Sequence, residues 1–416
     1  MIDLLKKVNL LGDNIPWLSD FRSQGREIFA KSGIPNAKVE AWKYTKPNMF
    51  FDNDFTANTT AISNSYKPKL PFDCYKICFI NGIFSPQASE MPQEIDILPI
   101  IEAVMFHPEI RQFIGGLADA KKYPFAALNA AYLNEGAYIH VSNTLDKPIA
   151  IVYHFTGANN MPMFNWRNVI MLDDNVKAEI IEYYNYDADL KACYFNNTVN
   201  EIYVGENAEL SHYKVQNDTF KAINIALQTV KVAKCGIYNS FCLQKGADLA
   251  RNESHVNLIA EQATAQVNAA YIMNGWAVLD TTTDIEHSAC NTYSSQLVKG
   301  VVGEQAKGVF QGKIHIAPNC IKTEGYQQHR ALLLSDEAEV DVKPELEIFA
   351  DDVKCTHGSA IGQLDAEQLF YMRSRGLDEE TAKQMLIEAY LDEVIAKVDN
   401  EKIAIWIKLI AQNDVN

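Results

Sequence analysis

The pattern of apolar and polar residues divides the chain into three parts. Over residues 1–135, apolar residues recur mostly at the three- and four-residue spacing of helices, with short strands between them. Over residues 136–362, short runs of alternating apolar and polar residues follow one another, separated by turn residues, as in half-buried strands. Residues 363–416 return to helical spacing. We therefore expect a mostly helical N-terminal region with short strands, a β-rich core and a C-terminal helical region.

Local signals predict several elements at the two ends of the chain. Residues 1 to about 33 should be mostly helical, and residues 97–133 should hold two further helices. A strand over residues 75–80 should end in an Asn-Gly turn. A helix should open at Asp365 with acids in its first turn, and Asp378 should cap the next helix.

The β-rich core contains an imperfect repeat of about 30 residues. Short strands that cannot each bury their own apolar face are typical of a stacked solenoid. A large sandwich or barrel would also give many short strands, so periodicity alone leaves these alternatives open. In each copy of the repeat a polar turn precedes an alanine, an acid and an aliphatic residue, at 176–180, 206–210, 245–249 and 336–340.

Candidate metal ligands lie near the end of this core. The alternation over residues 353–357 places Cys355 and His357 on the same face of a strand. Thiolate and imidazole are ligands that zinc, copper and iron-sulfur centres prefer. Two residues supply only half of a four-ligand site, so the alternative is a small core cysteine beside a hydrogen-bonded histidine.

The same stretch predicts an exposed strand edge. Pro344 has no backbone donor and belongs at a strand start, a bulge or an edge. We expect the strand to break there and to restart as Glu345–Phe349. Asp351 and Asp352 then form a turn signal.

Other polar residues of the core are weaker candidates for chemistry. We expect them to be surface or ladder residues, because solenoids expose many polar side chains on their outer faces. Cys320 lies closer in sequence to the candidate ligands and is a second candidate to face the same surface. The weaker candidates are Asp284, Glu286, His287, His315, Glu324 and His329.

Composition narrows the possible partners and location. The formal net charge of −16, from 37 basic and 53 acidic side chains, opposes binding to nucleic acid. No apolar run approaches the roughly 20 residues that span a bilayer, and the N-terminus lacks the apolar core of a signal peptide, so we expect a cytoplasmic protein without membrane contact. The eight scattered cysteines should then be reduced thiols. The chain contains no P-loop motif, so any ATP hydrolysis is expected in a partner.

Seven short motifs stand out, at residues 33–35, 40–45, 79–82, 332–336, 343–348, 351–358 and 370–376. Taken together they resemble the SufB/SufD family, the scaffold proteins of the Suf iron-sulfur cluster assembly machine. The resemblance covers most of the chain and is thin between about residues 160 and 230. SufB-like members carry a cysteine in the turn at 336–338 and a His-Glu-Ala-Thr run at 357–360. Because this chain has neither, it is more similar to the SufD-like members.

The resemblance implies a fold, a function and a set of partners. The fold would be mainly β, a right-handed parallel β-helix flanked by N-terminal and C-terminal helical regions. The chain would be a noncatalytic scaffold subunit that pairs with a SufB-like subunit through the edge at 345–349 and with a SufC-like ATPase through its C-terminal helices. His357, preferred over Cys355, would contribute to assembly of a transient iron-sulfur cluster, or hold iron, at the interface. Reduced flavin in the complex is a further implication. Because an exposed strand edge can also pair with its own copy, a homodimer of the isolated chain is a separate expectation.

Two alternative functions remain open. A β-helix enzyme that processes polysaccharides would use paired carboxylates, such as Asp351 with Asp352 or Asp284 with Glu286. Such enzymes need carboxylates about 5 to 9 Å apart around a sugar, whereas neighbouring acids in a turn are usually solvated. The other alternative is an interaction scaffold that does not bind metal at His357.

Overall fold

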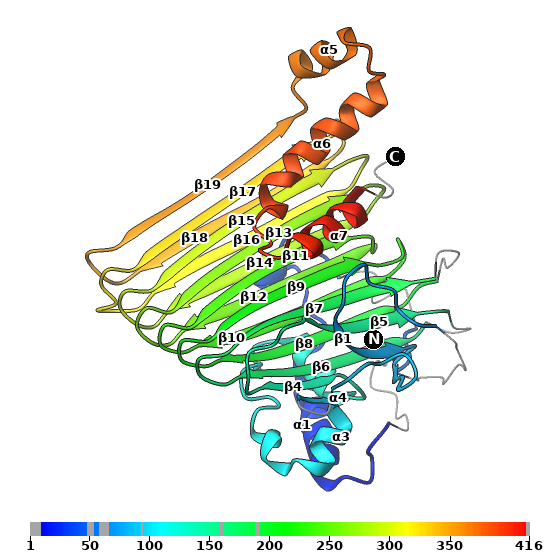
Figure 1. The fold of residues 1–416 in the computed structure, drawn as a ribbon, viewed down its shortest axis with the longest axis vertical. Helices are drawn as coiled ribbons and strands as arrows, with labels where there is room; N and C mark the ends of the chain where they lie inside the picture. The colour runs from blue at the N-terminus through cyan, green and yellow to red at the C-terminus, as the bar shows by residue number, and fades with distance from the viewer. Residues whose placement is uncertain are drawn as a thin grey trace.

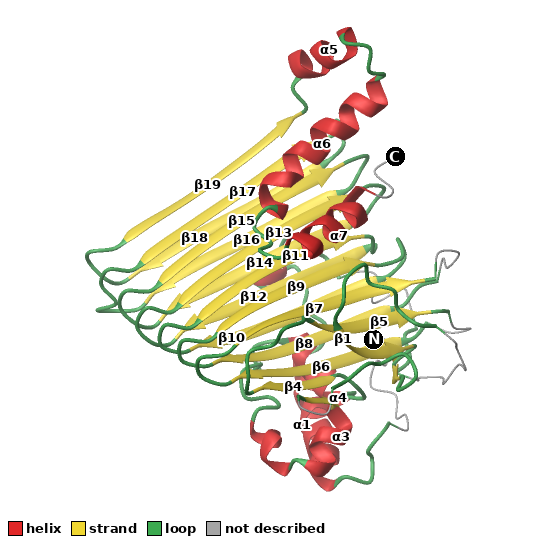
Figure 2. Ribbon diagram, in the orientation of Figure 1, coloured by secondary structure: helices red, strands yellow, loops and turns green. Residues whose placement is uncertain are grey.

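Two parallel β-sheets form a solenoid in the computed structural model (Figures 1 and 2). Successive strands of the core alternate between the two sheets, so each pair of strands makes one turn. The structure describes residues 10–47, 54–57, 66–92, 95–157, 161–187 and 192–412. The predicted mainly β fold with a parallel solenoid core is confirmed.

The first sheet holds ten strands in the order β19-β17-β15-β13-β11-β9-β7-β5-β1-β2. Every neighbouring pair is parallel except β1 with β2. The strands are β1 (Tyr75–Ile80), β2 (Ile83–Phe84), β5 (Ile149–Phe155), β7 (Lys177–Tyr186), β9 (Glu209–Asn217), β11 (Ile237–Lys245), β13 (Thr264–Met273), β15 (Tyr293–Val302), β17 (Glu324–Leu333) and β19 (Lys354–Gln363).

The second sheet holds nine strands in the order β18-β16-β14-β12-β10-β8-β6-β4-β3. Only β3 runs antiparallel to its neighbour. The strands are β3 (Asp96–Pro99), β4 (Ala137–Val141), β6 (Met163–Leu172), β8 (Phe195–Val204), β10 (Ile223–Val232), β12 (Leu249–Leu258), β14 (Val278–His287), β16 (Lys307–Ile316) and β18 (Glu339–Ile348).

The sequence repeat is the spacing between stacked turns. Tyr293 pairs with Glu324, and Glu324 pairs with Lys354, so residues about 30 positions apart lie side by side. Apolar side chains from the inner faces of both sheets form one continuous buried cluster, from Ile77 on β1 to Phe310 on β16. Stacking therefore buries the face that a single turn leaves open.

Helices at the N-terminal end cover the outer face of the second sheet (Figure 1). The described helical elements are α1 (Pro16–Ser32), η1 (Glu40–Trp42), α3 (Ile100–Phe106), η2 (Pro108–Gln112) and α4 (Pro124–Ala131). The predicted helix near the N-terminus is confirmed over α1, and its first nine residues lie outside the described part. The short antiparallel strands β2 and β3 complete this end of the two sheets.

Three helices follow the last strand. They are α5 (Ala366–Ser374), α6 (Glu379–Ile395) and α7 (Glu401–Gln412). Asp378 caps α6 as predicted, and Asp365 caps α5, each by accepting hydrogen bonds from backbone N–H groups of the first turn. Residues of α6 and α7 pack with the outer face of the first sheet, whereas α5 projects beyond it (Figure 1). None of the described helices is both long enough and apolar enough to span a membrane.

One local prediction about the strands is wrong. The chain does not break at Pro344, because β18 runs without interruption from Glu339 to Ile348. Pro344 is tolerated within the strand because β18 is the edge of its sheet. On the free side of an edge strand there is no neighbouring strand that would need a hydrogen bond from a backbone N–H group at this position. The predicted edge position is correct. The proposed boundaries at residues 135 and 362 stay a prediction, since β1 and β3 of the first region are themselves strands of the two sheets.

Candidate functional site

The last turn of the solenoid is open. Strands β18 and β19 end their sheets, and each has a neighbouring strand on one side only. Along β19, residues are exposed except for the half-buried Cys355, whereas most residues of β16 are buried. The inner-face residues Leu346 and Ile361 therefore remain accessible at this end, where a further turn would bury them.

Cys355 and His357 lie on the inner face of β19. Cys355 packs with the buried residues Ile314, Ile316 and Cys320, so its thiol faces the end of the core. By strand alternation the His357 side chain points the same way, and it is exposed. The sequence therefore identified correctly that the two residues share a face, and Cys320 packs in the same cluster as Cys355.

The two candidate ligands differ in their readiness to bind metal. Burial raises the pKa of the Cys355 thiol, although the backbone N–H of Gly325 partly offsets this effect. A metal ligand must be the thiolate, so the raised pKa disfavours ligation by Cys355 at neutral pH. His357 needs only to be neutral and accessible. Within the described residues, no cluster of three or more His, Cys, Asp or Glu side chains could hold a metal ion.

Beneath His357 lies a polar layer of the core. Gln327 is paired with His357 across β17 and β19, and its side chain fills the space that a Cβ at Gly312 would need. Neither amide atom of Gln327 has a hydrogen-bond partner among the described residues. Next to it, His329 is buried, receives or donates a hydrogen bond of 2.8 Å with the Tyr271 hydroxyl, and stacks on Phe310. The open turn thus places His357 above buried polar groups.

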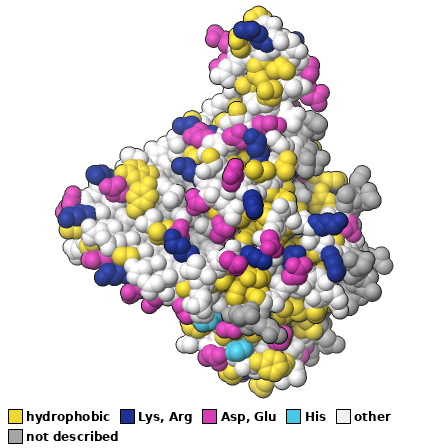
Figure 3. Space-filling model, in the orientation of Figure 1, with side chains coloured by type: hydrophobic (Ala, Val, Ile, Leu, Met, Phe, Trp, Pro, Cys, Tyr) yellow, Lys and Arg dark blue, Asp and Glu magenta, His cyan; other side chains and the backbone are white. Residues whose placement is uncertain are grey.

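A second exposed feature is the projecting helix α5. None of its residues is buried, and Phe370 and Tyr371 are largely exposed. The space-filling view shows hydrophobic side chains gathered on this projection (Figure 3). Met385 on the adjoining helix α6 is also exposed. These exposed apolar groups make α5 a candidate contact surface.

The weaker sequence candidates do not gather at the open turn. Asp284, Glu286 and His287 lie on β14, not in a turn, and His287 points to the opposite face from the two acids. The expectation of a surface or ladder position is wrong for His287 and His329, which are fully buried. Burial lowers the pKa of each of these two imidazoles to about 4. Both are therefore neutral core residues.

Sequence reasoning missed a polar row on the outer face of the second sheet. Arg251, Glu253 and His255 alternate along β12, and Asp284 continues the row from β14. The i, i+2 spacing of an arginine, a glutamate and a histidine in one strand was the available signal. Without the strand partner and the covering loop, that spacing does not distinguish a surface ladder from a lined cavity.

The fold and the site define a parallel β-solenoid with an open last turn that carries an exposed imidazole. Family models match the chain over most of its length. The model described as "SUF system FeS cluster assembly, SufBD core domain" matches residues 154–390, and the "SufBD protein N-terminal region" matches residues 6–151. The chain belongs to the SufBD family of the SUF iron-sulfur cluster assembly system.

Individual relatives agree with this assignment. The iron-sulfur cluster assembly SufBD family protein slr0076 of Synechocystis is 30% identical over 91% of this chain and 86% of its own. The iron-sulfur cluster assembly protein SufD of Escherichia coli is 29% identical over 89% of this chain and 87% of its own. SufD of Bacillus subtilis is 23% identical, with coverage of 93% and 91%. The chain is thus similar to SufD proteins along nearly all of its length.

Proposed function

We propose that this chain is a noncatalytic scaffold subunit of iron-sulfur cluster assembly that pairs with a SufB-like subunit through its open last turn. The observation that carries the proposal is the open turn itself. Unpaired strands β18 and β19 offer backbone hydrogen-bonding groups to a partner. Ile348, Phe349 and Ile361 add exposed apolar area around them. A related solenoid placed end to end would continue both sheets and cover these side chains.

In this proposal His357 contributes to assembly of a nascent cluster, or binds its iron, at the interface between the subunits. His357 is accessible on the inner face of the terminal strand, so a cluster bound there would lie between the two subunits. Because Cys355 and His357 alone are too few ligands, the partner would supply the others. The raised pKa of the Cys355 thiol favours His357 as the residue that acts.

The C-terminal projection is the proposed contact for a SufC-like ATPase. Helix α5 buries none of its own residues, so Phe370 and Tyr371 are free to enter a groove on a partner. Helices α6 and α7 hold the projection to the solenoid. Lys299 of β15 donates hydrogen bonds to the backbone of Tyr390 and to the Glu393 carboxylate. Movement of a bound ATPase would therefore act on the stacked strands through α6.

Two further expectations stay predictions. The open turn also suits a second copy of this chain, so the isolated protein is expected to form a homodimer when no SufB-like subunit is present. The other prediction is that reduced flavin takes part in the complex, and we assign no residue of this chain to flavin binding.

The test is anaerobic assembly of the three-subunit complex. The chain is co-expressed with its SufB-like and SufC-like partners, purified, and supplied with ferrous iron and sulfide, and visible absorption reports cluster formation. We expect His357→Ala to leave the complex intact by gel filtration and to reduce the cluster absorbance. Cys355→Ser should have a smaller effect. His107→Ala, at an exposed histidine after α3, is the matched control.

Unchanged cluster absorbance in an intact His357→Ala complex would contradict the assignment of His357. The chain would then be an interaction scaffold without a metal ligand. Failure of the wild-type chain to form a complex with the SufB-like subunit would contradict the pairing itself.

A further inference from the structure

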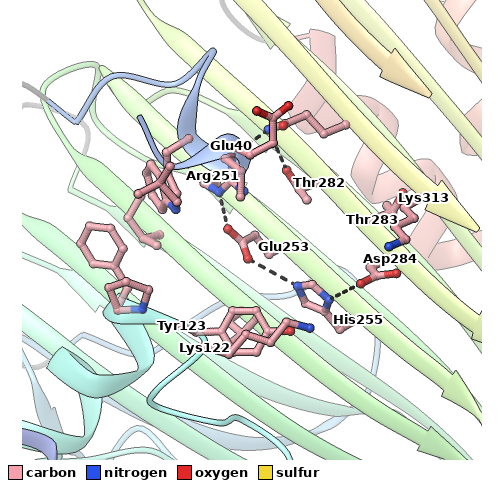
Figure 4. Close-up of a pocket in the computed structure, with 18 of the residues that line it drawn as sticks. Glu40, Lys122, Tyr123, Arg251, Glu253, His255, Thr282, Thr283, Asp284 and Lys313 are labelled. Atoms are coloured by element: carbon pink, nitrogen blue, oxygen red, sulfur yellow. Dashed lines mark hydrogen bonds and ion pairs between the residues drawn. The ribbon is translucent and has the colours of Figure 1, made fainter. Parts of the chain in front are cut away.

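A cavity of about 390 Å³ lies on the outer face of the second sheet, apart from the open inner face that carries His357 (Figure 4). Its floor is formed by β10, β12, β14 and β16. One wall is the segment around η1, and the other is the segment that leads into α4. This volume is within the range of small-molecule sites, which are about 300 to 1,000 Å³.

The floor carries a connected row of charged side chains. Arg251 donates hydrogen bonds to Glu253 and to Asp280, and His255 bridges Glu253 and Asp284 at 3.4 Å on each side. Figure 4 shows this row crossing the floor from Arg251 to Asp284. The row is held in place before any ligand arrives, which reduces the entropy cost of binding.

Every acid of this row already has a partner. Burial alone would raise the pKa of Glu253, but the charges and hydrogen bonds of Arg251 and His255 outweigh it and lower the pKa to about 2. Burial would likewise raise the pKa of Asp284, but His255, followed by the charge of Lys122, lowers it. Glu253 and Asp284 are therefore ionised and already paired, so they do not call for a cationic ligand.

The groups without partners are donors. Arg251 is fully buried and lines the cavity, yet its Nη2 atom has no hydrogen-bond partner among the described residues. Lys122 is exposed at the rim and, within the described ranges, forms no ion pair. In contrast, Lys313 and Lys343 at the rim are paired with Glu347 and Glu40. A ligand must therefore supply acceptors, and the exposed Lys122 ammonium favours an anionic one.

The walls are aromatic and apolar. Trp42 is buried over the Arg251 guanidinium, which lies 4.5 Å from its ring centroid. Opposite it, Tyr123 lies 4.8 Å from the His255 ring, and Phe125 and Leu227 complete the apolar lining. Side chains of this kind pack against flat, apolar ligand bodies.

We propose that this cavity is a binding site for a small planar aromatic anion. The aromatic body lies against Trp42, Tyr123 and Phe125. The anionic oxygens accept hydrogen bonds from the Lys122 ammonium at the rim of the cavity. This inference does not depend on the role of His357 or on the partners proposed above. The residues that carry it lie on the outer face of the second sheet or in the segments that cover that face, whereas His357 lies on the inner face of β19.

The probe is 2-naphthoate, a planar aromatic carboxylate, titrated into the full-length chain by isothermal calorimetry. The neutral isostere 2-naphthylmethanol is titrated in parallel. We expect saturable binding of the carboxylate with one site and much weaker binding of the alcohol, because only the carboxylate satisfies the unpaired donors. Saturation-transfer difference spectra check that the aromatic protons contact the protein.

Two variants locate the binding to this cavity. Lys122→Gln should weaken 2-naphthoate binding about tenfold, whereas Lys121→Gln, at the neighbouring exposed lysine outside the lining, should not change it. Ala41→Trp should abolish binding, because Ala41 is exposed on the wall and a larger side chain there fills the opening. Thermal unfolding confirms that the variants are folded.

Three outcomes would overturn the proposal. The first is no measurable binding of 2-naphthoate at millimolar concentration. The second is binding that Ala41→Trp leaves unchanged, which would place the probe elsewhere. The third is equal affinity for the carboxylate and the alcohol, which would contradict the anion-binding role of Lys122.

Discussion

Gln327 and His357 occupy paired positions on β17 and β19, yet Gln327 is buried and His357 is exposed. The difference arises because β17 lies between two strands, whereas β19 has a neighbour on one side only. A side chain that would be interior in any earlier turn becomes an accessible group in the last one. The proposed functional surface therefore consists of side chains that a further turn of the solenoid would bury.

If the open turn is the interface, a substitution there should weaken binding of the proposed SufB-like subunit. Phe349 follows β18 and is 60% exposed, so Phe349→Asp should leave the fold intact and weaken binding of the SufB-like subunit by about tenfold or more. Analytical ultracentrifugation of the mixed subunits measures this. Phe220→Asp is the matched control, since Phe220 is also 60% exposed and lies between β9 and β10. Equal weakening by both variants would contradict the proposed interface.

The projecting helix α5 predicts a separate effect on binding of the proposed SufC-like ATPase. The double variant Phe370→Ser with Tyr371→Ser removes exposed rings from a helix that buries nothing, so the melting temperature should not change. Binding of the SufC-like ATPase should weaken about tenfold, measured by calorimetry, because exposed aromatic anchors contribute strongly to interfaces. Phe106→Ser at the end of α3 should have no effect on that binding. Retention of full affinity in the double variant would move the ATPase contact elsewhere.

Buried histidines predict how stability depends on pH. Burial lowers the pKa of His329 to about 4 in the folded chain, against about 6.5 in the unfolded chain. The neutral form is favoured on folding, so this stabilisation is complete above about pH 6.5 and is lost as the pH falls towards 4. The shift corresponds to roughly 3 kcal/mol. His329→Gln should remove this dependence while its side-chain oxygen still accepts a hydrogen bond from Tyr271.

The measurement for His329 is the difference in urea unfolding free energy between wild type and variant at several pH values from 4.5 to 7.5. The difference should shrink as the pH falls, because only the wild type takes up this proton on unfolding. His107→Gln, at an exposed histidine, controls for loss of an imidazole outside the core. A difference that stays constant across this pH range would show that His329 does not titrate as expected.

Close packing of α1 on α4 predicts a destabilising glycine substitution. A Cβ at Gly25 would lie 2.5 Å from the backbone nitrogen of Ala131, so Gly25→Ala must push the two helices apart. Alanine is normally the better helix residue by about 1 kcal/mol, but the overlap should outweigh this gain and cost roughly 1 to 3 kcal/mol. Gly362→Ala, where a Cβ would meet nothing within 4 Å, should change stability by less than about 0.5 kcal/mol. Thermal unfolding of both variants tests the contrast.

Local signals in the sequence determined most of the elements. Asn81 and Gly82 adopt positive φ angles in the turn between β1 and β2, as the Asn-Gly pair predicts. Asp365 and Asp378 cap α5 and α6 because a cap depends on residues within one helical turn. The alternating runs predicted many short strands, and the family resemblance favoured the parallel solenoid over a sandwich or barrel. Pro344 predicted the exposed strand edge.

Contacts between distant residues decided what the sequence could not. Alternation assigns His287 and His329 to a face of a strand, but only the neighbouring turns show that this face is the buried one. The Pro344 strand continues because of its place at the sheet edge. The row from Arg251 to Asp284 becomes a lined cavity only where Trp42 and Tyr123 fold over it.

The sequence by itself determined the strands, the turns, the helix caps and the face shared by Cys355 and His357, because each depends on residues close together in the chain. The tertiary structure decided that His357 is accessible, that His329 is neutral and buried, and that Arg251 keeps a buried donor without a partner. These properties depend on which turn is stacked above and below each residue, and pairing across about 30 residues is not encoded in any local run.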